Sequence, residues 1–262
     1  MKIDYHLHTS VSFDSSATVD QMIGAAELAG LDEICVTDHF DYNDIPSMPS
    51  KRFSIESYRN AYDRTPASRV KLKRGVEAGL TPINTAEIAA LSDCYPFDFI
   101  IGSVHFVGGY DPYQKEYWQD ISVEEGFTKY LNGVLACVRV HDSFDVLGHI
   151  NYACKSPSIP VVKYSSYLDH SDLCDEIMRE VIKRGKGIEI NTSGVDRVGN
   201  FLPSREHIKR FRELGGEIIT VGSDAHDPSR VGQYISEATE IAKEIFGYVC
   251  TFENRKPIFN KL

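Results

Sequence analysis

Short runs of apolar and β-branched residues recur along the chain, and between them apolar residues are spaced three to four positions apart. The runs predict buried strands and the intervening segments predict amphipathic helices. Seven strands are expected, over residues 2–7, 32–38, 70–78, 98–105, 144–150, 186–191 and 216–224. The clearest helices are expected over residues 18–31, 123–141, 167–185 and 204–216. Glycines close several of these helices, as is common at helix C-termini.

This alternation of strands and helices is typical of βα units built around a parallel sheet. Units of roughly 35 residues favour a (β/α) barrel, here with seven units rather than eight, and an open doubly wound sheet is the alternative. No glycine-rich phosphate loop follows the first predicted strand, which weighs against the open sheet. Residues 40–54, with prolines and aromatics, are expected to form a long loop over the active face. Because no linker divides the sequence, we expect one domain over residues 1–262.

The composition narrows the class of protein. Of the 262 residues, 42% are hydrophobic and 25% are charged, as in ordinary globular proteins. A formal net charge of -10 argues against a general nucleic-acid or anionic-membrane surface, and no apolar run approaches the roughly 20 residues of a membrane helix. The six cysteines form no CxxC pair, and the chain starts without a charged-then-apolar leader. We therefore expect free thiols and a cytoplasmic protein.

The first predicted strand ends in two histidines, His6 and His8, within "KIDYHLHTS". Residues two apart in a strand face the same side, so both imidazoles can reach one ion. Taken alone this pair is weak, because histidines in strands often serve as hydrogen-bonded core residues. Further residues suited to metal binding stand at the ends of other predicted strands: Asp38, His39, Glu77, His105, His149, Asp224 and His226.

In a parallel barrel these strand ends meet at one face, which is where such folds carry their chemistry. Imidazole suits zinc, iron and manganese, and carboxylates can bridge two ions. Without Asp38, which we expect to orient a neighbouring imidazole or the backbone, and with Asp14 added, the set offers nine ligands. Nine ligands are too many for one ion and fit two or three ions that share bridges.

These residues resemble the motifs of the PHP (polymerase and histidinol phosphatase) family. HxH at 6–8, TDH at 37–39, a lone Glu77, histidines at strand ends and DxH at 224–226 stand in the family's order, so the resemblance covers essentially the whole chain. The chain length and "DFIIGSVHFV" look most like the stand-alone histidinol-phosphate phosphatases. The resemblance implies a distorted (β/α)7 TIM-like barrel with three divalent ions (Zn, Fe or Mn) at the C-terminal ends of its strands. It also implies hydrolysis of L-histidinol phosphate, in histidine biosynthesis, by a metal-bridging hydroxide.

The resemblance also implies a role for individual residues. The first ion would be held by His6, His8, Glu77 and Asp224, the second by Glu77, His105 and His149, and the third by Asp14, His39 and His226. The family's phosphate-contacting arginine maps to Arg197, which is expected to act in catalysis together with Glu77 and Asp224.

The remaining candidates concern the substrate. Lys155 and Arg230 are expected at the rim. The carboxylates and aromatics that could face the nitrogen groups of histidinol phosphate, or equally pack over the barrel mouth, are Asp41, Tyr42, Asp44, Tyr110, Asp111 and Trp118. The expected partner is a small phosphorylated metabolite, without nucleic acid or membrane. Two alternatives stay open: a phosphoesterase or nuclease acting on another metabolite or nucleotide, and a non-catalytic metal-binding module.

Overall fold

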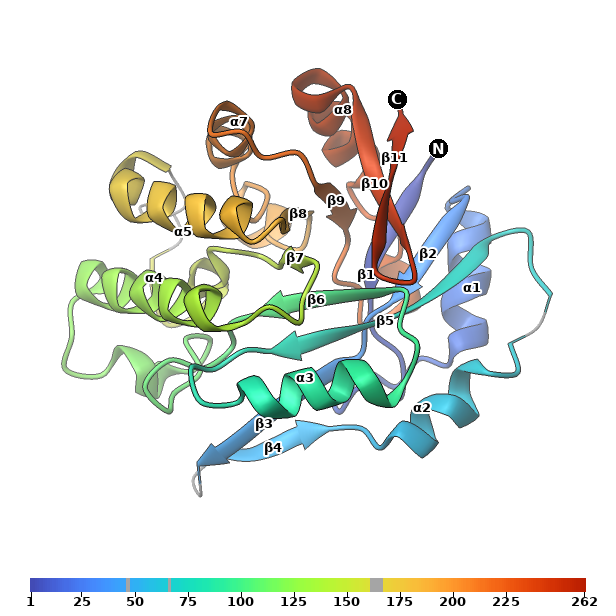
Figure 1. Ribbon diagram of the computed structural model, residues 1–262, viewed down its shortest axis with the longest axis horizontal. Helices are drawn as coiled ribbons and strands as arrows, with labels where there is room; N and C mark the ends of the chain where they lie inside the picture. Colours follow the sequence, from blue (N-terminus) through green and yellow to red (C-terminus); the bar gives the residue numbers. More distant parts are fainter. Residues whose placement is uncertain (46–47, 66, 161–166) are drawn as a thin grey trace.

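The computed structural model describes residues 1–45, 48–65, 67–160 and 167–262 (Figure 1). Seven parallel strands within these ranges lie side by side in chain order: β1 (Ile3–Leu7), β2 (Glu33–Val36), β5 (Lys71–Gly79), β6 (Phe99–Ser103), β7 (Val146–Leu147), β8 (Gly187–Asn191) and β9 (Ile219–Gly222). Each falls within or at the edge of a range predicted from the sequence. The apolar runs therefore marked strands that are buried on both faces.

The first and last strands meet and nearly close the sheet into a barrel. Leu7 forms a parallel bridge with Ala225. The amide of Asp224 donates to the carbonyl of His6 at 2.8 Å, and the amide of His8 donates to the carbonyl of Ala225 at 2.9 Å. The distorted seven-unit barrel is thus confirmed, and the open sheet is excluded.

Helices cover the outside of the sheet (Figure 1). In the described residues they are α1 (Val19–Leu28), α2 (Ile55–Tyr62), α3 (Thr85–Cys94), α4 (Val123–Val140), α5 (Ser171–Lys183), α6 (Val195–Val198), α7 (Arg205–Glu213) and α8 (Ile235–Phe246). Short 3-10 turns are η1 (Lys115–Trp118), η2 (Tyr152–Lys155), η3 (Tyr167–His170) and η4 (Pro228–Arg230). Capping boxes at Thr18 and Ser122 fix where α1 and α4 begin, because each hydroxyl accepts a hydrogen bond from a backbone amide that has no partner within the helix. None of the described helices combines the length and apolarity that a bilayer crossing requires.

The loop predicted over residues 40–54 is wrong for the described residues, which form a hairpin of β3 (His39–Ile45) and β4 (Met48–Arg52). The second predicted strand breaks at residues 37–38 and continues as β3, which pairs with β5 so that His39 lies opposite Glu77. Among the described strands β4 pairs only with β3, and such an edge strand tolerates prolines that a central strand excludes. Residues 46–47 and the side chain of Asp44 lie outside the described part of the chain.

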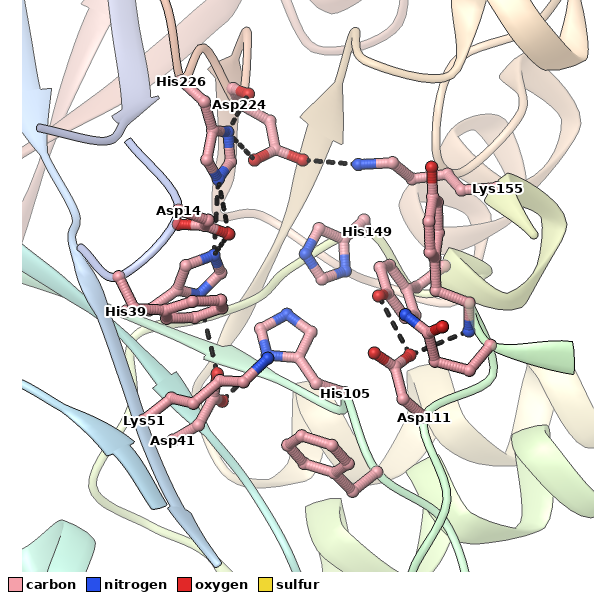
Figure 2. A pocket seen from close by; sticks show the side chains of 15 residues that line it. Asp14, His39, Asp41, Lys51, His105, Asp111, His149, Lys155, Asp224 and His226 are labelled. Carbon is pink, nitrogen blue, oxygen red and sulfur yellow. Dashed lines mark hydrogen bonds and ion pairs between the residues drawn. The ribbon is translucent and has the colours of Figure 1, made fainter. Parts of the chain in front are cut away.

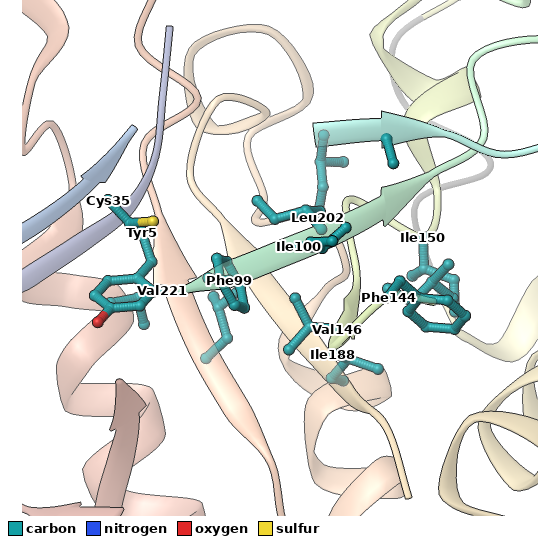
Figure 3. Packing of buried hydrophobic residues seen from close by; sticks show 14 of the residues in the cluster. Tyr5, Cys35, Phe99, Ile100, Phe144, Val146, Ile150, Ile188, Leu202 and Val221 are labelled. Atoms are coloured by element: carbon teal, nitrogen blue, oxygen red, sulfur yellow. The ribbon is translucent and has the colours of Figure 1, made fainter. Parts of the chain in front are cut away.

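Apolar side chains of neighbouring strands belong to one buried cluster, part of which Figure 3 shows, including Tyr5, Ile100, Val146, Ile188 and Val221. Each of these five residues is at most 1% exposed. Burial of one such aliphatic side chain contributes about 1.5–3 kcal/mol. The packed interior holds the strands rigidly, so the side chains at their carboxyl ends keep fixed positions.

A second hairpin, of β10 (Tyr248–Glu253) and β11 (Lys256–Lys261), packs against the amino ends of the strands and was not predicted. The ring of Phe252 lies 4.7 Å from that of Phe99, centroid to centroid, and its amide donates to the Tyr5 hydroxyl at 3.0 Å. Arg255 Nε donates to the Asp145 carboxylate at 2.5 Å. These contacts cover the amino end of the barrel, so the carboxyl end carries the pocket described below.

One ion pair fastens α5 to α7. Asp175 accepts hydrogen bonds from Arg210 Nε at 2.9 Å, from Arg210 Nη2 at 2.6 Å and from the Tyr167 hydroxyl at 2.6 Å. The hydrogen bonds from Arg210 lower the pKa of Asp175 to about 2. We expect Asp175→Asn to lower the free energy of unfolding by about 1–3 kcal/mol at neutral pH, measured by chemical denaturation.

The effect of this substitution should depend on pH. The pKa of Asp175 is lower in the folded chain than the value of about 3.9 for an unfolded one, so its stabilisation is present above about pH 4 and disappears as the pH falls towards 2. The difference between wild type and Asp175→Asn should shrink over that range. Asp172→Asn, at an exposed position of the same helix, is the control, and an equal loss there would contradict the assignment.

Candidate metal centre

The strand ends bring all nine predicted ligands into one continuous cluster, part of which Figure 2 shows. Glu77, on β5, lies at its centre and is fully buried. Its two oxygens lie 2.8–3.6 Å from ring nitrogens of five imidazoles: His6, His8, His39, His105 and His149. A carboxylate in this position can bind two ions, one through each of its oxygens.

Asp224 extends the cluster from the seam of the barrel. Its Oδ1 lies 3.5 Å from His6 Nε2 and 3.3 Å from His8 Nε2, while Lys155 Nζ donates to Oδ2 at 2.9 Å. The backbone of Asp224 has a φ of 56°, in the left-handed region that most residues avoid. Strained positions of this kind cluster at functional sites, because the surrounding structure has to enforce them.

A smaller triangle lies at the outer rim of the cluster. Asp14 Oδ2 is 3.4 Å from His39 Nε2 and 3.4 Å from His226 Nε2, and the two imidazole nitrogens are 3.4 Å apart. The Asp14 side chain is 34% exposed, so this part of the cluster opens towards solvent.

Several buried polar atoms of the cluster have no hydrogen-bond partner among the described residues: His6 Nε2, His8 Nε2, His39 Nδ1, His149 Nδ1 and Glu77 Oε2. Unpaired buried polar atoms are costly, and a bound cation would satisfy those that converge. Four triads of donor atoms lie within 4.8 Å: His8/His39/His226, His6/His8/Glu77, His6/His149/Asp224 and His39/Glu77/His105. The triads share members, so the donor set fits divalent ions that have ligands in common.

Glu77 and His8 have protonation states that suit metal binding. Burial raises the pKa of Glu77, but the nearby imidazoles, led by His6 and His105, outweigh it and hold this pKa well below its usual value. Burial lowers the pKa of His8 well below its usual value, and the adjacent His226 and His39 lower it further. An ionised carboxylate and a neutral imidazole are the forms that bind cations. Nearby carboxylates, by contrast, outweigh burial and raise the pKa of His6, His39 and His105, so these three imidazoles must lose a proton before they bind a cation.

Other polar groups fix the orientation of the rings. His6 Nδ1 lies 2.6 Å from Glu189 Oε1, and His105 Nδ1 lies 2.9 Å from Asp41 Oδ1. His8 Nδ1 lies 3.1 Å from Ser12 Oγ, which donates to Asp38 at 3.0 Å, so Asp38 orients His8 through Ser12. Such partners hold each imidazole in the tautomer that leaves its other nitrogen free for a metal.

Sequence reasoning missed Glu189. Its carboxylate is 1% exposed on β8, and it also accepts the His149 amide at 3.1 Å. The available signal was an acidic residue in the otherwise apolar strand "KGIEIN". Asp41, which was predicted to bind substrate, lines the pocket, is 3% exposed and contacts His105, and its role in substrate binding stays a prediction.

We expect Glu189→Gln to weaken metal retention, because it removes the charge that orients His6. The loss should be about 10-fold or more in affinity, measured by competition with a chromogenic chelator. Glu217→Gln, at an exposed position, is the matched control. Unchanged retention in Glu189→Gln would show that His6 is positioned by packing alone.

A cavity of about 380 Å³ opens above the cluster. Besides presumed ligands, its described lining includes Phe13, Lys51, Asp111, Tyr113, Gln114, Tyr152 and Lys155. A cavity of this size suits a small molecule. The pocket therefore joins a polar wall to a cluster of metal-binding side chains.

The predicted phosphate contacts fall in different places. Lys155 lines the pocket, but Arg197 and Arg230 are absent from its described lining. Arg197 Nη2 donates to the backbone carbonyls of Ser156 and Ile159, and Arg230 pairs with Asp196 at 2.9 Å on the surface. Both arginines are thus occupied in holding loops, which their sequence positions alone did not reveal.

The loop candidates for the substrate's nitrogen groups separate in the same way. Asp111 faces the pocket, whereas Tyr42, Tyr110 and Trp118 are not part of its described lining. The indole of Trp118 donates to the carbonyl of Pro112 at 2.7 Å and packs beneath the loop.

Comparison with known proteins gives concordant results. The PHP domain model matches residues 4–193. A protein of Clostridium acetobutylicum named "Probable histidinol-phosphatase" is 32% identical, with 99% of this chain and 96% of that protein covered. The histidinol-phosphatase of Lactococcus lactis is 31% identical, with 99% and 97% covered. A crystal structure of the Lactococcus lactis histidinol phosphate phosphatase with zinc, L-histidinol and phosphate superposes with a TM-score of 0.85, at 28% identity and 98% coverage of both chains.

Proposed function

This chain belongs to the PHP family, and we propose that it hydrolyses L-histidinol phosphate to L-histidinol and phosphate in histidine biosynthesis. The observation that carries the proposal is the buried cluster around Glu77, which opens into a cavity of small-molecule size. The full-length likeness to histidinol-phosphatases supports this choice of substrate.

We propose three divalent ions, Zn, Fe or Mn, held by the nine residues of the cluster. His6, His8, Glu77 and Asp224 would hold the first, Glu77, His105 and His149 the second, and Asp14, His39 and His226 the third. Bound ions would supply an activated water at neutral pH and charge neutralisation for the phosphoryl group.

The protein's own side chains position the reactants. Glu77 and Asp224 hold the imidazoles in register and balance their charge, and Asp224 also fixes the ammonium of Lys155 at the cavity wall. Lys155, which was expected at the rim, is placed to contact a phosphate oxygen, and we propose this role for it beside the phosphate contact predicted for Arg197. A cationic group there stabilises the charge that develops on the departing oxygen.

We also propose that residues 1–262 act as one domain, because the β10–β11 hairpin packs against strands of the same barrel. None of the six cysteines forms a disulfide within the described part of the chain, which supports the reducing cytoplasm as the proposed location.

The test is phosphate release by the purified protein loaded with zinc or manganese. L-Histidinol phosphate should be hydrolysed at least about 100-fold faster, in kcat/KM, than 4-nitrophenyl phosphate, because enzymes use contacts to non-reacting groups to accelerate chemistry. Equal slow turnover of both esters would contradict the proposed substrate but not the proposed phosphatase chemistry. Faster release of mononucleotides from an oligonucleotide would favour a nuclease, and no turnover of any ester would favour a non-catalytic module.

A further inference from the structure

Asp111 stands apart from the other carboxylates of the pocket. It lies in the loop between β6 and η1, and in Figure 2 the rings of His105 and His149 separate it from Asp14 and His39. Its position therefore puts negative charge on a part of the wall that the presumed metal ligands do not occupy.

Four aspartates line the described pocket, and three of them have basic partners. Asp14 contacts two imidazoles, Asp41 contacts His105, and Asp224 pairs with Lys155. Asp111 accepts hydrogen bonds only at Oδ1, from the Tyr113 amide at 2.8 Å and the Tyr152 hydroxyl at 3.2 Å. No lysine, arginine or histidine of the described residues forms an ion pair with it.

A half-buried carboxylate without a cation is energetically unfavourable. Burial raises the pKa of Asp111 and outweighs the lowering effect of the nearby but unpaired His105 and Lys51, which reflects the cost of keeping its charge away from water. The other lysine of the pocket, Lys51, instead places its ammonium 4.1 Å from the centre of the Phe13 ring. The free oxygen of Asp111 thus remains available to a cationic ligand, which would offset this cost.

The carboxylate is also close to the reacting centre. Tyr152 links the two, because its hydroxyl binds Asp111 while its ring centroid lies 5.2 Å from that of His149 and 5.3 Å from that of His105. Asp111 is thus one side chain away from the presumed metal ligands. In L-histidinol phosphate the amine is carried by the carbon next to the phosphorylated carbon, and the imidazole lies one carbon further on.

We propose that Asp111 determines specificity by binding a cationic nitrogen, either the ammonium or the imidazolium, on the alcohol portion of the phosphate ester. The inference rests on the proposed function and assigns the recognition of the leaving group to one residue. The metal cluster and Lys155 would bind the anionic end of the substrate, and Asp111 its cationic end.

The experiment compares wild type, Asp111→Asn and the matched exposed control Asp120→Asn on four phosphate monoesters. These are L-histidinol phosphate, its analogue without the amine, O-phosphoalaninol, which keeps the amine but lacks the imidazole, and glycerol phosphate. A hydrogen bond to a charged group contributes about 1.5–3 kcal/mol, so Asp111→Asn should lower kcat/KM for L-histidinol phosphate about 10–100-fold, mainly through KM. Glycerol phosphate should change by less than about 2-fold, and Asp120→Asn should match wild type.

The two analogues identify the nitrogen. The analogue that lacks the recognised group should be a poor substrate for wild type and should be insensitive to Asp111→Asn. An equal loss on all four esters would overturn the inference, since it would indicate a structural role. So would a wild-type enzyme that accepts both analogues as well as L-histidinol phosphate, a result that does not depend on how the variant folds. One outcome separates the two proposals. If wild type hydrolyses L-histidinol phosphate no faster than 4-nitrophenyl phosphate, but hydrolyses O-phosphoalaninol faster than glycerol phosphate only while Asp111 is present, the proposed substrate fails and the inference stands.

Discussion

Glu77→Gln is expected to lower kcat/KM about 1,000-fold and to reduce the bound metal. Glu77 is the carboxylate that five imidazoles share, and glutamine keeps its size while removing the charge that balances the ions. Loss of several kcal/mol of charge stabilisation corresponds to a rate effect of this order. Steady-state phosphate release and metal analysis of the same preparation measure the two effects.

Glu217→Gln, an exposed change of the same chemistry, should retain wild-type activity and metal content. Circular dichroism of the Glu77→Gln protein should show the wild-type helix content, since the barrel packing does not depend on the charge. Full activity with a normal complement of metal would remove Glu77 from the site we propose.

Removal of the ions should have the second largest effect, and it acts on both activity and stability. Dialysis against a strong chelator should leave less than about 1% of the activity, because the remaining side chains cannot activate water at neutral pH. Ions bound about 1,000-fold above their Kd stabilise the fold by about 4 kcal/mol, so the Tm should fall by about 10 °C. Differential scanning fluorimetry and phosphate release before and after chelation make the measurement.

Addition of zinc or manganese should restore both properties. A matched sample treated with chelator that is already saturated with zinc controls for effects of the reagent itself. Chelated protein that keeps its activity and its Tm would contradict a metal-dependent site. Recovery of Tm without recovery of activity would indicate that the ions support the fold alone.

The sequence predicted the barrel because its strands are largely buried and appear as short runs rich in apolar and β-branched residues, separated by helical segments. The two hairpins were not predicted from the sequence, for a related reason. β3–β4 and β10–β11 lie outside the seven-strand barrel path, and their mixed polar and apolar residues, with Pro49 in β4, look like a loop. Edge pairing depends on what the rest of the fold leaves open, which a local pattern does not encode.

The candidate site, too, could be predicted from the sequence only in part. The ligand positions were predictable because parallel strands end at one face, so residue type and strand position together gave their place. The role of Glu189 depends on which way the ring of His6 turns, and Arg197 depends on which carbonyl lies within its reach. Side-chain direction of this kind arises from packing between distant segments, which sequence spacing does not encode.

The seam between β1 and β9 also determines when the protein can first bind its ions. His6 meets Glu189 across 183 positions of sequence, and another of its neighbours in the cluster, Asp224, comes later still. Contacts this distant in sequence form late in folding, because a long loop must close before they add stability. During synthesis the amino-terminal histidines leave the ribosome long before their partners exist. We therefore expect metal loading to follow translation of nearly the whole chain, because a partial chain carries the HxH motif without Glu189 and Asp224.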